Sequence, residues 1–315
     1  MLSAGVPRVV ALGGGHGLAA TLQALRRVTS QITAIVTVAD DGGSSGRLRA
    51  EFDILPPGDL RMALAALCGD DADGRLWADV LQSRFGGDGP LAGHAIGNLL
   101  IAGIWQRLGD PVAGLDMVGR LLGAQGRVLP MAAVPLAIEA DVIGLDPDHP
   151  DEHGLVTGQA HVAVTKGFIQ EVRLIPGRPP ACPESLAAVR QADAVVLGPG
   201  SWFTSVVPHL LVPELAEALV DTSARRVLNL NVVSSSEMAE YSASGHLEVI
   251  AEHAPKLRFD TIICDPTMAA GDPHLERYAE SLGAELRVSR VRARDGSPRH
   301  DVNRLASVFA DVLGR

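Results

Sequence analysis

The chain has 315 residues, of which 47% are hydrophobic and 20% charged, so it can bury one large α/β core or two smaller ones and does not resemble a disordered chain. Its net charge of −10 and its lack of a long basic run argue against nucleic acid or an anionic membrane as the main partner. Three scattered cysteines fit a reducing compartment and no zinc site. The sequence shows neither a signal-peptide pattern nor an apolar stretch of about 20 residues, so we expect a cytoplasmic protein without membrane insertion.

The first predicted unit is a strand, a glycine turn and a helix. An apolar run at 9–12 precedes GGGHG, and apolar residues then recur with helical spacing. Glycines let the backbone approach a ligand, and the free N–H groups of a helix start favour an anion such as phosphate. The candidate phosphate contacts are Gly13, Gly14, Gly15, His16 and Gly17. Leu18 breaks the dinucleotide fingerprint, which weakens a nicotinamide-cofactor reading.

A second strand, at 32–38, ends in DDGGSSG. In a parallel sheet both loops then lie at the strands' carboxyl ends, where ligands bind. Asp40 or Asp41 could accept hydrogen bonds from ribose hydroxyls, or the pair could hold a hydrated Mg²⁺. An ordinary tight turn is the alternative, but two such loops on adjacent strands favour a binding site.

Next, Asp59 is predicted to cap a helix that carries Leu60, Leu64 and Leu67. Arg61 falls in its first turn, where a cation is unfavourable for the helix dipole, which suggests a nearby phosphate or carboxylate. A surface arginine without contacts is the alternative. We expect helices at 77–85 and 112–124.

His94 and Asn98 stand one helical turn apart at the start of an apolar helix, and share a face. A neutral His94 could donate to a pyrophosphate or sugar oxygen, although a lone histidine there is more often structural.

From about 127 to 176 the pattern changes to β-branched alternation, which predicts an antiparallel insertion with strands at 134–143 and 155–175. His149, His153 and His161 lie near aspartates, but their spacing favours a solvated loop over a metal site.

The α/β pattern then resumes with a helix at 183–191 and a strand at 194–197. This strand ends in a third glycine loop, with Gly198, Gly200, Ser201, Thr204 and Ser205, suited to phosphate or sugar or else to capping a helix. A strand at 227–231 ends in Asn229 and Asn231, and strands at 262–264 and 286–288 and a helix at 301–313 follow. Repeated units of this kind predict one domain, 1–315, with a doubly wound, mostly parallel, Rossmann-like sheet and a β-rich insertion.

The motifs GGGHGL, VTVADDGGSSGRLR, ILPPGDLR, GHAIGNLL and GPGSWFTSV occur in this order across the chain. They resemble the YvcK family, the so-called gluconeogenesis factors, which is similar in fold to the 2-phospho-L-lactate transferases of deazaflavin cofactor synthesis. The resemblance implies a cytoplasmic homo-oligomer that binds a UDP-sugar, UDP-N-acetylglucosamine in the best-known members. It also implies a regulatory protein partner and a role in carbon partition to peptidoglycan precursors and in cell shape, with no settled catalytic activity.

By the same resemblance, Ser44, Ser45, Arg61, His94 and Asn98 belong to the ligand site. Tyr241 matches a nucleotide-binding tyrosine that could stack on uracil, and Arg277 matches a second ligand contact. The segment 233–245 departs from the family pattern while keeping Glu237 and Tyr241, and His16 replaces a threonine common in relatives.

Two hypotheses follow. The first is a UDP-sugar binding protein, because three anion-suited loops occur without an obvious nucleophile–base pair. The second is a Mg²⁺-dependent transferase of the phospholactate type, in which Asp40 and Asp41 hold the metal and orient an acceptor hydroxyl.

Overall fold

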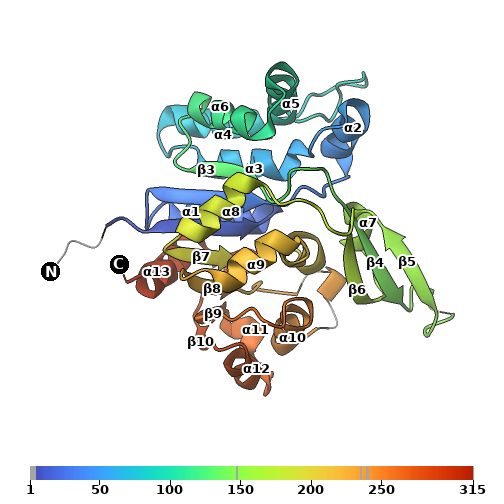
Figure 1. Cartoon of the computed structure of the whole chain (residues 1–315), viewed down its shortest axis with the longest axis vertical. Coiled ribbons are helices and arrows are strands. Elements are labelled where there is room, and N and C mark those ends of the chain that lie inside the picture. Colours follow the sequence, from blue (N-terminus) through green and yellow to red (C-terminus); the bar gives the residue numbers. More distant parts are fainter. Residues whose placement is uncertain (1–4, 147, 235, 239–240, 315) are drawn as a thin grey trace.

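A computed structural model describes residues 5–146, 148–234, 236–238 and 241–314. The expected loop at 146–151 and the segment 233–245 therefore include Pro147, Ser235, Ala239 and Glu240, which lie outside the described residues. Figure 1 shows a central sheet with helices on both sides and a smaller sheet to the right.

The central sheet has seven parallel strands in the order β10-β9-β8-β7-β1-β2-β3. Buried β-branched and leucine side chains form its interior, as the apolar runs predict. The expected Rossmann-like, mostly parallel architecture is confirmed. Its strands are β1 (Arg8–Gly13), β2 (Gln31–Val36), β3 (Arg127–Pro130), β7 (Ala194–Leu197), β8 (Arg225–Asn229), β9 (Thr261–Cys264) and β10 (Glu285–Val288).

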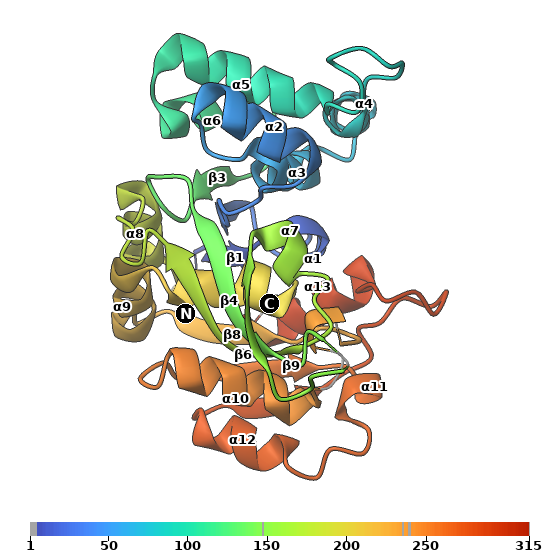
Figure 2. The same cartoon turned by 90° about the vertical axis from the view of Figure 1, so that its right-hand side faces the viewer.

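Helices cover both faces of this sheet (Figure 2): α8 (Pro183–Gln191) and α9 (Pro213–Asp221) on one side, α1 (Gly15–Leu25) and α13 (Val302–Val312) on the other. A group of helices lies beyond β3, and another beyond β9 and β10 (Figure 1). The first group is α2 (Gly43–Phe52), α3 (Pro57–Leu67), α4 (Ala72–Gln82), α5 (Ile96–Leu108) and α6 (Pro111–Leu121), and the second is α10 (Ala243–His253), α11 (Pro266–Ala269) and α12 (Leu275–Ser281).

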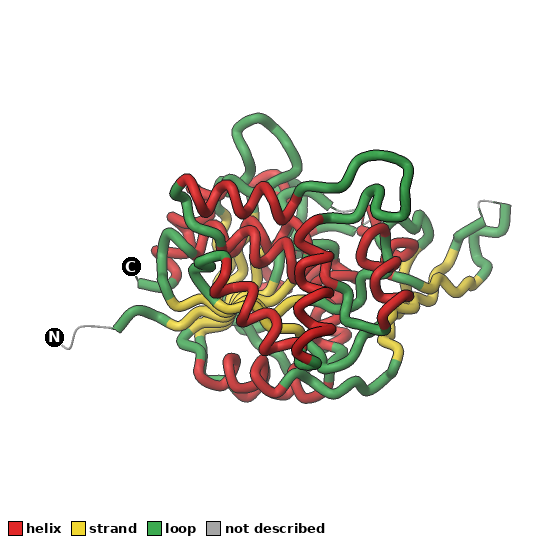
Figure 3. Tube along the Cα trace, turned by 90° about the horizontal axis from the view of Figure 1, so that it is seen from above, coloured by secondary structure: helices red, strands yellow, loops and turns green. Residues whose placement is uncertain are grey.

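The insertion is an antiparallel sheet, β5-β4-β6, that extends from the body (Figure 3). It consists of β4 (Ala137–Ile143), β5 (His153–Thr157) and β6 (Phe168–Ile175), with the short α7 (Gln159–Val162) after β5. Two expectations need correction. Residues 127–130 form β3 and pair with β2 instead of joining the insertion, and 155–175 is split by α7 into two strands.

Two helix starts also differ from expectation. The residue before α3 is Pro56, so Asp59 is the third helical residue and not the cap. The reason is Pro57, which is well suited to the first position of a helix. Helix α4 begins at Ala72, because Asp71 caps it by accepting from the Gly74 N–H, and it ends at Gln82.

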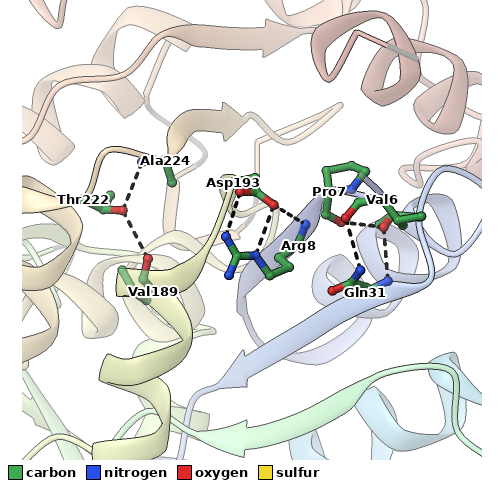
Figure 4. Close-up of polar contacts among 9 residues, drawn as sticks. Val6, Pro7, Arg8, Gln31, Val189, Asp193, Thr222 and Ala224 are labelled. Atoms are coloured by element: carbon green, nitrogen blue, oxygen red, sulfur yellow. Dashed lines mark hydrogen bonds and ion pairs between the residues drawn. The ribbon is translucent and has the colours of Figure 1, made fainter. Parts of the chain in front are cut away.

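The amino ends of the strands hold a closed set of polar contacts (Figure 4). Arg8 pairs with Asp193 through its backbone N–H at 2.8 Å and its guanidinium at 3.0 Å. Thr222 donates to the Val189 carbonyl at 3.1 Å. These groups satisfy one another and hold neighbouring loops together.

One observation concerns membrane segments. Within the described ranges no single helix is long and apolar enough to span a bilayer, whereas one pair, Trp202–Leu210 and Pro213–Asp221, meets the length and composition test but is bent by 74°.

Candidate functional site

A groove of about 850 Å³ lies at the carboxyl ends of the strands. It is formed mainly by the start of α1, the loop after β7, the loop after β8 and the residues before α13, and α3, α4 and the residue after α7 contribute one side chain each. Its lining includes His16, Gly17, Ala20, Gln23, Met62, Gln82, Pro199, Gly200, Ser201, Asn231, Val233, Ser234, Arg299 and His300.

The first glycine loop is in close contact with the third. A Cβ on Gly17 would lie 2.3 Å from the carbonyl oxygen of Pro199, and one on Gly14 would lie 2.4 Å from Oδ2 of Asp59. Only glycine fits at either position without a shift, and Gly15, with φ of +55°, takes a left-handed backbone conformation. The two loops therefore form one surface beside the groove, as their order along the sheet predicts.

Asp59 is the main residue of the site that the sequence did not single out as a ligand. Its Oδ2 accepts from the Thr37 hydroxyl at 3.0 Å, and its carboxylate also accepts from the Gly15 N–H at the start of α1. Burial, followed by the charge of Asp40, raises the pKa of Asp59 to about 6. A carboxyl with a perturbed pKa beside a ligand groove is typical of a functional site.

The two consecutive aspartates have different neighbours. Asp40 accepts from the Gly42 N–H at 3.0 Å and lies close to Gly58 and Asp59. Asp41 instead accepts from the Ala160 N–H of the insertion at 3.0 Å. Asp40 therefore interacts with the Asp59 carboxyl group, whereas the Asp41 side chain turns to the insertion.

A cation at Asp40 and Asp59 would need further ligands. Among the described residues no group of three histidine, cysteine, aspartate or glutamate side chains gathers as a metal site. The two carboxylates are nevertheless suitable donors for Mg²⁺, which usually keeps several waters and takes the remaining oxygens from a bound phosphate. The residues present fit a Mg²⁺ that is held together with a ligand.

Ser44, His94 and Asn98 meet in a buried network. Ser44 Oγ accepts from Asn98 Nδ2 at 3.0 Å and from the Ala95 N–H at 3.4 Å, and lies 3.0 Å from His94 Nδ1. Since both acceptor positions of the hydroxyl are used, its proton goes to Nδ1, and His94 carries its own proton on Nε2. Burial and the charge of Arg47 lower the pKa of His94, so the ring stays neutral.

Arg61 is buried, at 5% exposure, so the alternative of a surface arginine does not hold. Burial and the charge of Arg84 lower the pKa of Arg61, and the charges of Asp59 and Asp40 oppose that shift. Its Nε has no hydrogen-bond partner in the described part of the chain.

The polar groups of the third loop are largely used within the protein. The Asn231 side chain makes two hydrogen bonds to the backbone of Gly200: it accepts from the N–H at 3.0 Å and donates to the carbonyl at 2.8 Å. Ser201 donates to Glu237 at 2.7 Å, and Thr204 donates to Ser201 at 2.6 Å. The Ser201 and Thr204 hydroxyls, expected as ligand donors, therefore shape the loop. Asn229 is fully buried behind it.

Tyr241 and Arg277 lie outside the groove lining. The ring of Tyr241 stacks on Phe168 with centroids 5.2 Å apart and 12° between planes, and its hydroxyl donates to the Ile169 carbonyl at 3.1 Å. Burial raises the pKa of Tyr241 to about 12. Arg277 is exposed on α12, with its guanidinium 5.5 Å from the Tyr278 ring centroid. Their ligand roles stay predictions.

Among the groove residues that were not proposed as ligand contacts are Asn231, Arg299 and His300. Burial lowers the pKa of His300 to about 4, so its ring is neutral. The two asparagines at 229 and 231 stand at a strand end, so the sequence alone could have indicated Asn231 as a groove residue. No sequence pattern indicated Arg299 and His300, because they reach the groove only through the path that the chain takes before α13.

The chain is similar to known proteins over nearly its whole length. The family model for "2-phospho-L-lactate transferase CofD" matches residues 9–301. A Mycobacterium tuberculosis H37Rv protein named "Putative gluconeogenesis factor" is 56% identical over 311 residues, which cover 98% of this chain and 90% of that protein. A Listeria innocua protein named "Gluconeogenesis factor" is 33% identical over 319 residues, covering 98% and 96%.

A crystal structure of a UPF0052 family member from Bacillus halodurans superposes with a TM-score of 0.84 at 34% identity, covering 98% of this chain and 99% of that one. The matches to the family and to the relatives extend over nearly the whole chain and include all three glycine loops. The chain therefore belongs to the CofD family and, within it, to the group of proteins named gluconeogenesis factors.

Proposed function

We propose that the protein is a cytoplasmic regulator that binds a nucleotide sugar, with UDP-N-acetylglucosamine as the first ligand to test. The observation that supports this most is the groove where the loops after β1, β7 and β8 meet. Its volume of about 850 Å³ lies within the range of small-molecule sites. Backbone segments from several strands line the groove, so that one ligand could contact more than one of them.

The pyrophosphate is proposed to lie at the start of α1, near His16 and Gly17, opposite Gly200. Free N–H groups and the helix dipole favour an anion there. Arg299 adds a positive charge from the other wall. Asp59 already accepts the Gly15 N–H, so a phosphate beside it would meet a negative charge unless Asp59 is protonated or shares a Mg²⁺ with the ligand.

Regulation is proposed to follow from the groove being formed by segments of separate strands. A ligand that touches both the loop after β7 and residues 231–234 would fix their relative positions, and so alter the surface presented to a partner protein. The names of the relatives point to control of carbon flow, and we propose supply of cell-wall precursors and cell shape as the processes affected.

The test is calorimetric titration with UDP-N-acetylglucosamine, with and without Mg²⁺. Arg299→Ala should weaken binding by about tenfold, whereas Arg294→Ala, an exposed arginine of the same segment outside the groove, should change it little. Absence of affinity at millimolar ligand in the wild-type protein would refute the proposal.

One observation favours a second function, a transferase of the phospholactate type. The neighbouring carboxyls of Asp40 and Asp59, one with a raised pKa, could hold Mg²⁺ or accept a proton from an acceptor hydroxyl. Incubation with lactyl-diphosphoguanosine, deazaflavin acceptor and Mg²⁺ tests this reading. Turnover by the wild-type protein that Asp59→Asn abolishes would establish the transferase function. Absence of turnover by the wild-type protein would refute it.

A further inference from the structure

Strand β5 is an open edge of the insertion sheet. It is the outermost strand of the smaller sheet in Figure 1, and the insertion projects from the body in Figure 3. Within the described ranges the strand pairs with β4 alone, and no backbone hydrogen bond joins it to another segment. Leu155, at its centre, is 54% exposed. An unpaired strand edge of this kind is a template for another strand.

Two hydrogen bonds at the ends of β5 show which of its backbone groups point outward. The Gly158 N–H donates to the Ile138 carbonyl at 2.8 Å, and the Gly144 N–H donates to the Glu152 carbonyl at 3.2 Å. Hydrogen-bonded pairs recur at every second residue of an antiparallel ladder, so the even-numbered residues of β5 face β4. The odd-numbered residues direct their N–H and C=O groups to the open side: His153, Leu155 and Thr157.

The other sheet edges in the described part of the chain carry features that hinder pairing. Strand β3 ends in Pro130, which has no N–H, and β10 contains Glu285 and Arg287. On β6 the Tyr241 hydroxyl occupies the Ile169 carbonyl at 3.1 Å. Prolines, charges and covering groups are the usual protection of an edge strand. The sequence of β5, HGLVT, has no proline, lysine or carboxylate, which indicates that this edge is meant to be paired.

The edge is complementary to itself. A two-fold axis at Leu155 would place a second β5 antiparallel to the first, with Leu155 opposite Leu155 and His153 opposite Thr157. These are the residues whose backbone groups point outward, so each facing pair could exchange two N–H···O bonds. The Thr157 carbonyl accepts from the His161 ring at 3.0 Å and keeps a second lone pair for this purpose. The exposed leucines would form an apolar cross-strand pair at the axis.

The charges around β5 are compatible with a second copy, although the chain has a net charge of −10. Asp141, which lies beside Leu155 on β4, is paired with Arg173 at 2.7 Å. In the register with the axis at Leu155, Glu152 would face Gly158 of the second copy. Like charges therefore do not meet across the strands, and the carboxylate nearest the axis is already compensated.

We propose that β5 pairs with β5 of a second copy of this chain, so that the two insertion sheets become one continuous sheet. Pairing over five residues buries less than the roughly 1,200 Å² at the lower end of standard interfaces, so the dimer should dissociate in the micromolar range. Strand β5 continues into α7, where the Ala160 N–H binds Asp41, and Ala163 lines the groove. The dimer would therefore connect the two grooves through the insertions, whichever ligand they bind.

Sedimentation velocity of the full chain, from about 1 to 200 µM, tests the proposal. The wild-type protein should form a reversible dimer as its concentration rises. Leu155→Lys places two positive charges opposite one another and should weaken the dimer dissociation constant by at least about tenfold. Leu121→Lys, at a leucine of α6 that is 51% exposed, is the matched control and should leave the dimer unchanged.

A mixture of two variants tests the position of the axis. Leu155→Lys and Leu155→Glu should each be monomeric alone, because each variant sets like charges against one another. Their equimolar mixture should regain the dimer, because the axis at Leu155 sets a lysine against a glutamate. Position 155 is exposed, so neither variant disturbs a buried contact.

Hydrogen exchange resolved to single amides gives an independent readout. The Leu155 amide should exchange more slowly as protein concentration rises, whereas the Val156 amide, which faces β4, should be protected at every concentration. Leu155 exchange that is independent of concentration, a dimer that Leu155→Lys does not weaken, or a mixture that stays monomeric would overturn the proposal. A wild-type protein that is monomeric at about 200 µM would also overturn it, and an extended segment of another protein would then be the occupant to test. None of these outcomes depends on nucleotide-sugar binding.

Discussion

The Thr37 hydroxyl donates a 3.0 Å hydrogen bond to Oδ2 of Asp59, which joins the loop after β2 to the first turn of α3. This bond stabilises the ionised carboxylate, but burial and the neighbouring Asp40 outweigh it and raise the pKa of Asp59 to about 6. Asp59 is therefore a group that changes charge close to physiological pH, beside Gly14 and Gly15 at the start of α1.

Replacement of Asp59 should stabilise the protein at alkaline pH. The folded-state pKa of about 6 lies above the ordinary value of 3.8, so the folded state binds the proton more tightly, and stability falls as pH rises through this window. Asp59→Asn should raise the free energy of unfolding by on the order of 1–2 kcal/mol at about pH 8 and change it little near pH 4. Urea denaturation at both pH values measures this, with exposed Asp88→Asn as the control. A stability gain that is the same at both pH values would contradict the assignment.

The affinity for a nucleotide sugar should depend on the same proton. Below about pH 6 Asp59 is neutral and no longer repels the pyrophosphate, so binding without Mg²⁺ should be about tenfold tighter near pH 5 than near pH 8. Saturating Mg²⁺ should reduce this difference, because a cation between carboxylates and phosphate replaces the proton. Calorimetry on the wild-type protein and on Asp59→Asn measures both effects. A pH dependence that persists unchanged in the variant would exclude Asp59 as its source.

The fold could be predicted from sequence because its signals are local. β-branched runs that end in glycine loops repeat along the chain, and each such unit contributes a parallel strand. The site could be predicted only in part. The loops around Gly14 and Gly200 were found, but a pattern does not show that Glu237 takes the Ser201 hydroxyl from 36 residues away. Asp59 was misread as a cap, because Pro57 starts the helix three residues earlier than expected and turns the carboxylate toward α1.

Tyr241 should hold the insertion to the body. Its ring stacks on Phe168 and its hydroxyl bonds to Ile169, both at the start of β6. Tyr241→Phe should cost about 1 kcal/mol for the lost hydrogen bond. Tyr241→Ala should cost about 2–3 kcal/mol and speed amide exchange in β6. If Tyr241 also stacks on uracil, Tyr241→Ala should lower the affinity for the nucleotide sugar. Phe168→Ala should leave that affinity unchanged, because it weakens the attachment of the insertion but keeps the tyrosine. An equal fall in both variants would mean that Tyr241 acts only through the insertion.

The contact between the first and third glycine loops should tolerate no side chain at Gly17. A Cβ there would lie 2.3 Å from the Pro199 oxygen and 2.6 Å from its carbonyl carbon, and backbone cannot move aside as the end of a flexible side chain can. Gly17→Ala should therefore push the 198–200 loop away from α1. We expect a loss of about 2–4 kcal/mol in the free energy of unfolding, together with loss of nucleotide-sugar binding.

Gly103→Ala is the matched control, because Gly103 is exposed within α5 and a Cβ there meets nothing within 4 Å. That change should stabilise the helix by up to about 1 kcal/mol and leave binding unchanged. Chemical denaturation and calorimetry on both variants separate a general effect of alanine from the specific contact at Pro199. A Gly17→Ala protein that is as stable as the wild type and binds with equal affinity would show that the two loops do not form one surface at the groove.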